Sequence, residues 1–319
     1  MTLGDRYGVG PELVATLVST VSLPSGVAGV VVGDPDVFTA GCAVAQRSKL
    51  ATVASFDDVP PGWSFLPRPT AIPVTPLGRV SADAGREVLD TLTMLAKAAR
   101  NGDIQGIVYA PLNKQAMKAA GHLAGDELEF LNIHLPAAGL TGEINILDRL
   151  WTSRVTSHVA LGKVAGLITR QRVGAAINLL ADALQRSGVH SPRLAVAALN
   201  PHAGEGGAFG TEEIDVLTPA IEDAHARGLD ASGPIPSDTV FSRALGGEFD
   251  GVVTMFHDQG QIALKLIGLG KGVTLLAGFP VPIATPAHGT AYDKAGTGTA
   301  RPDGLVAATR LVLTMMETP

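Results

Sequence analysis

Short apolar segments that alternate with helix-like segments constrain the fold of this 319-residue chain more than any other feature. One β-branched segment, 27–32, ends at a Gly-Asp-Pro turn, and similar segments cover 106–110, 194–199 and 251–255. They are apolar almost throughout, which is typical of strands whose two faces are both covered. The sequence therefore predicts an α/β fold with mostly parallel sheets and helices on both faces.

The segments between these strands carry apolar residues at the three-to-four-residue spacing of amphipathic helices. The clearest is 82–100, where Val88, Leu92, Leu95 and Ala99 share this spacing and Gly102 marks the end. We expect further helices at 113–120, 173–186, 211–227 and 305–316. A chain of this length matches two α/β lobes with a cleft between them, and one lobe can be built from both chain ends.

Composition argues against several classes of function. A formal net charge of −6, from 24 Lys and Arg against 30 Asp and Glu, disfavours a nucleic-acid surface, which needs clustered basic residues. Cys42 is the only cysteine, so no disulfide can form within the chain, as is typical of a reducing compartment. No apolar run reaches the length of a membrane span, and no signal-peptide pattern opens the sequence. We expect a cytoplasmic protein that binds neither nucleic acid nor membranes.

Three histidines, His158, His202 and His257, each follow a predicted strand, where open α/β sheets bind their ligands. The preceding strands are 154–156, 194–199 and 251–255. Neutral imidazole is the commonest metal ligand, and three imidazoles with one open position suit catalysis by a divalent ion. Each histidine taken alone fits a hydrogen-bonded loop residue better than a metal ligand. Because all three lie at strand ends, two of them in glycine-rich loops beside acids, we interpret them as metal ligands.

A glycine-rich segment, 288–298, precedes the last predicted helix and reads His-Gly-Thr-Ala-Tyr-Asp-Lys-Ala-Gly-Thr-Gly. Its glycines allow a ligand to approach the backbone, and its histidine and aspartate can hydrogen-bond a ribose or an adenine. A second glycine-bearing turn, 4–12, has a proline at a helix start and backbone N–H groups that can face an anion. Either segment alone also fits an ordinary loop. The absence of G-x-G-x-x-G, P-loop and G-x-S-x-G motifs disfavours a Rossmann domain, a P-loop NTPase and an α/β-hydrolase.

Five motifs resemble the 4-hydroxythreonine-4-phosphate dehydrogenase family. They are Pro-Leu-Asn-Lys at 111–114, Asn-Pro-His-Ala-Gly-Glu-Gly-Gly at 200–207, Gly-Pro-Ile-Pro-Ser-Asp-Thr at 233–239, His-Asp-Gln-Gly at 257–260 and His-Gly-Thr-Ala at 288–291. The match runs in the family's order from the opening Gly-Asp turn to Gly298. The last motif also resembles the adenosine-binding loop of isocitrate and isopropylmalate dehydrogenases, which explains how a nicotinamide enzyme lacks the Rossmann motif.

The resemblance implies two α/β/α lobes like those of isocitrate and isopropylmalate dehydrogenases. We place a nucleotide-associated lobe at 1–120 plus 285–319 and a metal-binding and dimerisation lobe at 121–284. The family's site is shared across a homodimer, with metal ligands from both subunits. By the resemblance, the ligands here are His158, His202 and His257, and the ion is Zn²⁺ or another divalent ion such as Mg²⁺, Mn²⁺ or Co²⁺.

The implied reaction is oxidation of a secondary alcohol by NAD or NADP, giving a β-keto acid that can then lose carbon dioxide. The metal would polarise the hydroxyl and then the carbonyl. Lys265 follows His257 by one or two helical turns and can face the substrate, while Asp238 and Asp258 are expected to orient ligands or carry protons. The residues expected to bind the nucleotide are His288, Gly289, Thr290, Asp293 and Gly296.

The substrate pocket departs from the family's pattern. The family has Gly-His-Thr-Glu where this chain reads Gly125-Asp126-Glu127, and it has asparagine and arginine where Thr274 and Ala284 stand. Acidic residues in place of the phosphate-binding His-Thr pair would repel a phosphate dianion. We therefore expect a substrate without phosphate, such as a dihydrodiol carboxylate of aromatic degradation. The residues expected to line its pocket are Asp126, Glu127, Lys265 and Thr274.

Two alternatives remain open. The first is the ordinary 4-phosphooxy-L-threonine dehydrogenase of pyridoxal phosphate biosynthesis, with the phosphate bound through other residues. The second is a non-catalytic small-molecule binding protein with the same fold. The three histidines disfavour the second alternative, because a binding module has little need of an open metal site.

Overall fold

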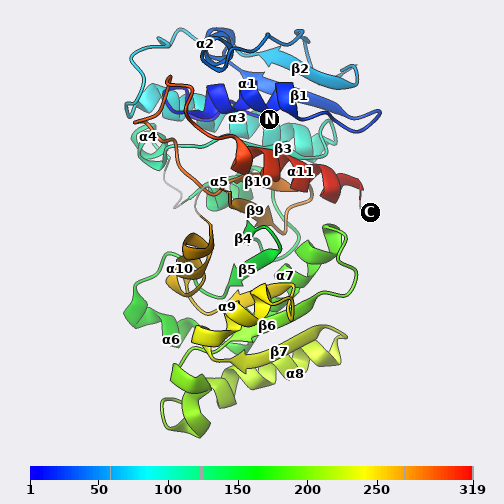
Figure 1. Ribbon diagram of the computed structural model, residues 1–319, viewed down its shortest axis with the longest axis vertical. Helices are drawn as coiled ribbons and strands as arrows, with labels where there is room; N and C mark the ends of the chain where they lie inside the picture. The colour runs from blue at the N-terminus through cyan, green and yellow to red at the C-terminus, as the bar shows by residue number, and fades with distance from the viewer. Residues whose placement is uncertain (58, 123–125, 269–270, 318–319) are drawn as a thin grey trace. The chain divides into compact units, whose positions relative to one another are not determined.

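The computed structural model describes residues 1–57, 59–122, 126–268 and 271–317. The chain forms two compact α/β units, and Figure 1 labels most of their helices and strands. Unit 1 comprises Met1–Ala137 and Phe279–Met316, and unit 2 comprises Ala138–Gly278 with the residues from Glu317 onward. The predicted α/β class with mostly parallel strands is confirmed.

Unit 1 is built from alternating strands and helices. Its elements are α1 (Gly10–Thr20), β1 (Ala28–Gly33), α2 (Pro35–Ala45), β2 (Gly62–Pro67), α3 (Ala82–Asn101), β3 (Ile107–Val108), α4 (Lys114–Ala119), α5 (Glu127–His134), β10 (Ile283–Pro286) and α11 (Asp303–Glu317). β1 pairs with β2 and β3 pairs with β10, both in parallel. Thr2 forms parallel bridges with Val32 and with Tyr109, so the opening residues lie between β1 and the chain just after β3.

Local signals set the ends of helices in unit 1. Asp34 Oδ1 accepts hydrogen bonds from the backbone N–H groups of Asp36 and Val37, at 2.9 and 3.2 Å, and thereby begins α2. The Ser81 hydroxyl lies at the same position before α3. That helix ends at Gly102, whose φ of 85° falls in the left-handed region that glycine adopts without strain. The predicted helix over 82–100 is thereby confirmed.

Unit 2 is built around a run of neighbouring strands, from β9 to β7. Its elements are β4 (Gly142–Leu147), β5 (Leu150–Arg154), η1 (Leu161–Lys163), α6 (Val164–Leu167), α7 (Arg170–Arg186), β6 (Arg193–Ala197), η2 (Pro201–Gly207), η3 (Glu213–Leu217), α8 (Thr218–Ala226), β7 (Asp230–Ile235), α9 (Ser237–Leu245), β8 (Gly251–Thr254), α10 (His257–Ile267) and β9 (Val273–Ala277). The strand order is β9-β4-β5-β8-β6-β7. β4 is antiparallel to both of its neighbours, and the other pairs are parallel.

Small residues let helices approach this sheet closely. Ala195 and Ala197 of β6 are fully buried in a core cluster that includes Phe249 and Leu264. A Cβ atom on Gly251 would lie 2.9 Å from Leu180 of α7, so β8 packs directly under that helix. None of the described helices combines the length and the apolar character needed to cross a bilayer.

Two sequence-based expectations differ from the structure in detail. The single helix predicted over 211–227 is a π-helical turn, η3, followed by α8, with Pro219 in the first turn of α8 where a missing N–H is tolerated. The lobe boundaries predicted near 120 and 284 compare with unit boundaries after 137 and 278. α5 falls in unit 1 because it packs against α3, and β10 does so because it pairs with β3.

Candidate active site

The carboxyl ends of β5, β8 and β6 lie side by side, because these strands are parallel neighbours in unit 2. The chain leaves each strand in a segment that carries one of the predicted metal ligands. His158 follows β5, His257 begins α10 after β8, and His202 lies in η2 after β6. The topology thus brings all three segments to the edge where α/β sheets bind ligands.

His158 and His257 lie against each other at this edge. Their ring centroids are 5.7 Å apart, with the planes inclined by 41°. Two imidazoles that bind one ion at about 2.0–2.1 Å, with a tetrahedral angle between them, have centroids roughly 5 Å apart. The observed separation therefore fits two imidazole ligands of a single metal ion.

The neighbouring carboxylate holds one nitrogen of His257. Nδ1 of His257 lies 2.7 Å from Oδ1 of Asp258. A carboxylate at this nitrogen fixes the tautomer and orientation of the ring and leaves the other nitrogen for a metal. The side chain of His257 is 37% exposed, so an ion or a substrate can reach it. This arrangement is consistent with the orienting role predicted for Asp258.

His202 lies in a loop with an unusual backbone. Five successive residues, from His202 to Gly206, have φ values between 43° and 80°, in the left-handed region. Three of the five carry a side chain, and the left-handed conformation costs such a residue roughly 1–2 kcal/mol. Strain of this kind persists only where the surrounding structure imposes it, and it is concentrated at functional sites. The backbone therefore supports a functional role for His202.

Gln259 joins two of these strand ends, although sequence reasoning assigned it no role. Its Nε2 donates to the carbonyl oxygen of Ala198, after β6, at 2.8 Å and to the hydroxyl of Ser237 in α9 at 2.7 Å. Its Oε1 accepts a hydrogen bond from the backbone N–H of Met255, after β8, at 2.6 Å. One side chain thus fixes the ends of two strands relative to each other. Its place in the His-Asp-Gln-Gly motif was the available signal.

Within the part of the chain that the structure describes, no three His, Cys, Asp or Glu side chains come together closely enough to hold a metal ion. The ring of His202 packs near Phe209, at 6.3 Å between centroids. Two of the three predicted ligands, His158 and His257, have their rings in contact. The site with three histidine ligands accordingly stays a prediction.

One face of α10 carries several of the predicted groups. His257, Gln261 and Lys265 recur every fourth residue and so share a face, and Lys265 is exposed. Asp238 is exposed in the first turn of α9. Asp238 thus lies at a helix start and Lys265 in the last turn of α10, and the chemical roles of both stay predictions.

A polar cluster that sequence reasoning missed connects β4, β5, β9 and α10. Oδ1 of Asn145 accepts hydrogen bonds from Arg154 at 2.9 Å and from Gln261 at 2.7 Å. Nδ2 of Asn145 donates to the hydroxyl of Thr274 at 3.1 Å. Arg154 also forms an ion pair with Glu143. Thr274, predicted to contact the substrate, is therefore part of this internal cluster.

In unit 1 the two glycine-bearing segments, 4–12 and 288–298, are hydrogen-bonded to each other. The bonds run from the Tyr292 hydroxyl to Asp5 Oδ2 (2.8 Å), from the Val9 N–H to the Thr290 carbonyl (3.0 Å) and from the Gly296 N–H to Glu12 Oε2 (2.8 Å). A Cβ atom on Gly8 would lie 2.9 Å from Thr290, so glycine is required for this approach. Two motifs that were weak separately form one structure.

The residues predicted to bind the nucleotide divide between the two sides of segment 288–298. Thr290 is buried against the turn 4–12, and His288 is half-buried with Nδ1 3.0 Å from the carbonyl oxygen of Gly289. Gly289, Asp293 and Gly296 are exposed. The exposed side of the segment is thus the side that a nucleotide can contact.

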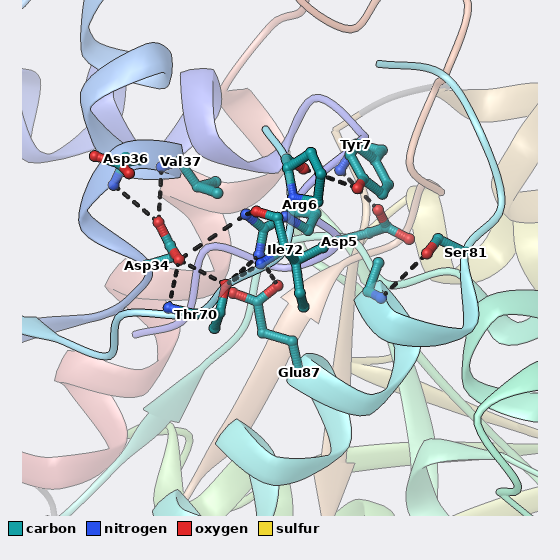
Figure 2. A network of polar contacts seen from close by, with 12 residues as sticks. Asp5, Arg6, Tyr7, Asp34, Asp36, Val37, Thr70, Ile72, Ser81 and Glu87 are labelled. Carbon is teal, nitrogen blue, oxygen red and sulfur yellow. Dashed lines mark hydrogen bonds and ion pairs between the residues drawn. The ribbon is translucent and has the colours of Figure 1, made fainter. Parts of the chain in front are cut away.

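Figure 2 shows the buried polar network that anchors the turn 4–12. The guanidinium of Arg6, which is 1% exposed, donates to Thr70 at 2.9 Å, to Glu87 at 2.8 Å and to the carbonyl oxygen of Ile72 at 2.7 Å. Burial raises the pKa of Glu87, and the charge of Arg6 opposes that rise. Thr70 also donates to Asp34, so the start of α2 belongs to the same network.

The acidic residues that depart from the family's phosphate motif lie in unit 1. Asp126 begins α5, and its Oδ1 accepts a hydrogen bond from the Glu129 N–H at 3.0 Å. Glu127 forms an ion pair with Lys114 at 3.3 Å. Gly125, which opens the motif, lies outside the described residues. The negative charge of Glu127 is therefore partly balanced by a lysine of the Pro-Leu-Asn-Lys motif.

Comparison with known proteins decides the family. The family described as pyridoxal phosphate biosynthetic protein PdxA matches residues 27–312, most of the chain. The chain belongs to the PdxA family. A relative from Pseudomonas aeruginosa is 43% identical over 316 residues, covering 94% of this chain and 91% of the relative. The resemblance stated from the motifs is confirmed.

Named relatives of this PdxA-family chain are dehydrogenases of phosphorylated substrates. The 4-hydroxythreonine-4-phosphate dehydrogenase of Desulfosudis oleivorans is 40% identical, covering 97% of this chain and 93% of the relative. The D-threonate 4-phosphate dehydrogenase of Salmonella typhimurium is 37% identical, covering 98% and 97%. The chain is therefore an NAD(P)-dependent dehydrogenase that acts on a CH–OH group.

Solved structures agree with this assignment. The 4-hydroxythreonine-4-phosphate dehydrogenase of Klebsiella pneumoniae superposes with a TM-score of 0.81 at 31% identity, covering 99% of this chain and 96% of that one. A terephthalate 1,2-cis-dihydrodiol dehydrogenase of Burkholderia xenovorans superposes with a TM-score of 0.68 at 26% identity, covering 98% and 96%. Proteins with this fold are thus named as dehydrogenases of a phosphorylated substrate in one case and of an unphosphorylated substrate in the other.

Proposed function

We propose that this PdxA-family dehydrogenase oxidises the secondary alcohol of a hydroxy acid at a divalent metal held by His158, His202 and His257, with loss of carbon dioxide from the β-keto acid afterwards. The observation that carries the proposal is the pair of imidazoles of His158 and His257, 5.7 Å apart at the carboxyl edge of the sheet. A divalent ion there supplies Lewis-acid polarisation of the alcohol and carbonyl oxygens. Imidazole ligands suit Zn²⁺ or Co²⁺ better than Mg²⁺ or Mn²⁺.

In this proposal, charged side chains of unit 2 bind the substrate and move its proton. Lys265, on the His257 face of α10, binds the substrate carboxylate through its ammonium group. Asp258 keeps the His257 ring in one orientation through the contact at Nδ1. Asp238 and Asp258 are both exposed and can pass the hydroxyl proton to solvent.

In the same proposal NAD or NADP binds to unit 1 along 288–298. The support is that Gly289, Asp293 and Gly296 are exposed while the other side of the segment is bonded to the turn 4–12. The carboxylate of Asp293 suits the two hydroxyls of an adenosine ribose, which favours NAD. Binding of NADP would depend on Lys294 or Arg301, and Arg301 is already paired with Asp303 at 2.8 Å.

The proposed substrate carries no phosphate. Asp126 is an anion at the start of α5, and Ala284, at the position of the family's arginine, is fully buried in β10. Neither residue can donate a charge-assisted hydrogen bond to a phosphate, and the negative charge of Asp126 disfavours a phosphate beside it. A hydroxy acid or a cis-dihydrodiol carboxylate has no phosphate and fits such a pocket. The name of the Burkholderia xenovorans relative supports the dihydrodiol class of substrate.

A phosphorylated substrate is the second candidate, favoured by one observation. Lys114 lies 3.3 Å from Glu127 and offsets its charge, so the family's phosphate region retains a cation. The substrates in the names of the Desulfosudis and Salmonella relatives are 4-phosphorylated. The two candidates differ in whether the substrate ends in a phosphate.

The test is a substrate panel assayed by the absorbance of reduced nicotinamide, with NAD or NADP and with each divalent ion. The panel contains a cis-dihydrodiol carboxylate, unphosphorylated 4-hydroxythreonine, its 4-phosphate and D-threonate 4-phosphate. Each lost charge-assisted bond costs roughly 1.5–3 kcal/mol, so loss of two lowers kcat/KM for the phosphorylated compounds about 100-fold or more. Efficient turnover of a phosphorylated compound, with kcat/KM of about 10⁴ M⁻¹s⁻¹ or more, would establish the second candidate. Absence of metal-dependent turnover with every compound would overturn the proposal.

A further inference from the structure

A buried carboxylate holds the loop that carries His202. Glu213, in η3, is 2% exposed. Its Oε1 accepts hydrogen bonds from the backbone N–H groups of Leu199 and Asn200, at 2.9 and 2.7 Å. Its Oε2 accepts one from the side-chain amide of Asn200 at 2.9 Å. One carboxylate therefore binds two of the residues that connect β6 to the left-handed segment.

The left-handed segment also packs against this carboxylate. A Cβ atom on Gly204 would lie 2.8 Å from Oε2 of Glu213 and 3.1 Å from the carbonyl oxygen of Gly210. Glu212 adds a second acceptor, since its Oε2 lies 2.7 Å from the same amide nitrogen of Asn200. These two consecutive acids, Glu212 just before the π-helical turn and Glu213 at its start, face one loop, and turns of this type are frequent at functional sites.

The three bonds require a carboxylate at position 213 in particular. Both oxygens of Glu213 face N–H donors, so a glutamine would place its own NH₂ group against a donor. The amide of Asn200 cannot relieve the conflict by turning over, because its NH₂ group also donates to Glu212. Leaving buried groups in donor-to-donor contact destabilises the loop.

We infer that Glu213 is a positioning residue for the metal site: by binding Leu199 and Asn200 it holds the left-handed segment 202–206 that presents His202. The inference rests on the proposed function, because it takes His202 as a metal ligand. Glu213 acts through the loop and not by contact with the ion. Its effect is to set the geometry of His202 before metal or substrate arrives.

The test compares Glu213→Gln with Asp215→Asn, which removes the same charge from an exposed side chain in the same turn. Amide hydrogen exchange at Leu199 and Asn200 in the metal-free protein reports on the loop itself. Calorimetric titration with Co²⁺ reports on the metal site. We expect Glu213→Gln to exchange faster at both amides and to bind Co²⁺ about 10- to 100-fold more weakly, whereas Asp215→Asn matches the wild type.

The wild type and His202→Ala, titrated in parallel, separate this inference from the proposed function. If His202→Ala binds Co²⁺ as tightly as the wild type, the proposed metal site fails, and the exchange data still decide whether Glu213 holds the loop. If His202→Ala loses Co²⁺ while folded Glu213→Gln retains full affinity, the inference is overturned. It is also overturned if Asp215→Asn loses as much Co²⁺ affinity as Glu213→Gln.

A second variant covers the case in which Glu213→Gln does not fold. Asn200→Ser removes the side-chain bonds to both glutamates and keeps the backbone bonds to Glu213. We expect about a tenfold loss of Co²⁺ affinity for this variant. Unchanged affinity in Asn200→Ser would overturn the inference.

Discussion

His257 has its position set by a strand end on one side and by a neighbouring carboxylate on the other. It begins α10 directly after β8, and Asp258 holds its Nδ1 at 2.7 Å. His158 reaches it from the end of β5 with a left-handed φ of 46°, a conformation that few side-chain-bearing residues adopt. The strained backbone at His158 and at His202 therefore marks both residues independently of the sequence motifs.

The residue-scale prediction concerns His257→Ala. Removing one imidazole from the pair should weaken binding of Zn²⁺ or Co²⁺ by about 100-fold or more and abolish turnover. Because the side chain is 37% exposed, the fold should survive, as checked by circular dichroism and thermal melting. His190→Ala, an exposed histidine of the same unit, is the matched control. Full metal occupancy of His257→Ala in elemental analysis would contradict the ligand assignment.

At the scale of elements, unit 1 joins segments from both ends of the chain into one surface. The turn 4–12 and the segment 288–298 are bonded through Tyr292 and Asp5 on one side and through Gly296 and Glu12 on the other. Burial raises the pKa of Tyr292, and the charge of Asp5 adds to the rise, so the phenol remains a hydrogen-bond donor. The exposed side of 288–298 depends on this support.

Tyr292→Phe tests that dependence. The change removes one hydroxyl that donates to a buried carboxylate, a bond worth about 1 kcal/mol or more. We expect KM for NAD to rise roughly three- to tenfold, with Co²⁺ affinity unchanged because the histidines belong to unit 2. An unchanged KM for both NAD and NADP would show that the nucleotide binds elsewhere or does not need this support.

A second element-scale prediction concerns the start of α2. Burial by itself raises the pKa of Asp34, but hydrogen bonds from Thr70, Val37 and Asp36 outweigh it and hold the pKa below its ordinary value of 3.8. A depressed folded pKa means that the stabilisation is complete above pH 3.8 and is lost as the pH falls through the folded pKa.

Asp34→Asn keeps one acceptor oxygen and loses the charge. We expect the free energy of unfolding in urea to fall by about 2 kcal/mol at pH 7, because both bonds from Thr70 are weakened. The difference from the wild type should shrink as the pH falls below 3.8 and the wild-type carboxyl becomes protonated. A difference that stays constant between pH 7 and pH 2.5 would contradict the assignment of the effect to the carboxylate.

At the scale of the whole molecule, one chain supplies the contact between His158 and His257. We predict a homodimer in which His202 completes the site of the partner subunit. Mixing His202→Ala with His257→Ala chains should then restore about a quarter of wild-type turnover, because half of the dimers are mixed and each has one intact site. The matched control mixes His158→Ala with His257→Ala. One chain supplies both of these histidines to a site, so no mixed dimer has an intact site and no turnover should be restored.

The subunit composition of both mixtures is checked by native mass spectrometry. Mixed dimers of His202→Ala and His257→Ala without turnover would contradict a site shared in this way. A monomeric wild type with full turnover in light scattering would contradict the homodimer itself.

The sequence by itself determined the α/β class, the helix over 82–100 with its end at Gly102, and the family. These features depend on local signals: apolar strand segments, capping residues and long motifs are readable without knowing what packs against them. The sequence also predicted that the segments carrying the three histidines follow parallel strands, and such segments gather at one edge of a sheet.

Only the tertiary structure decided which distant residues come into contact. Contacts such as Tyr292 with Asp5, Asn145 with Gln261, and Glu213 with the loop after β6 join residues whose sequence spacing carries no periodic signal. The π-helical turn before α8 likewise could not be predicted from the sequence, because its pattern of apolar residues is that of an ordinary α-helix. Such contacts follow from the packing of distant segments, so no local rule of propensity or capping predicts them.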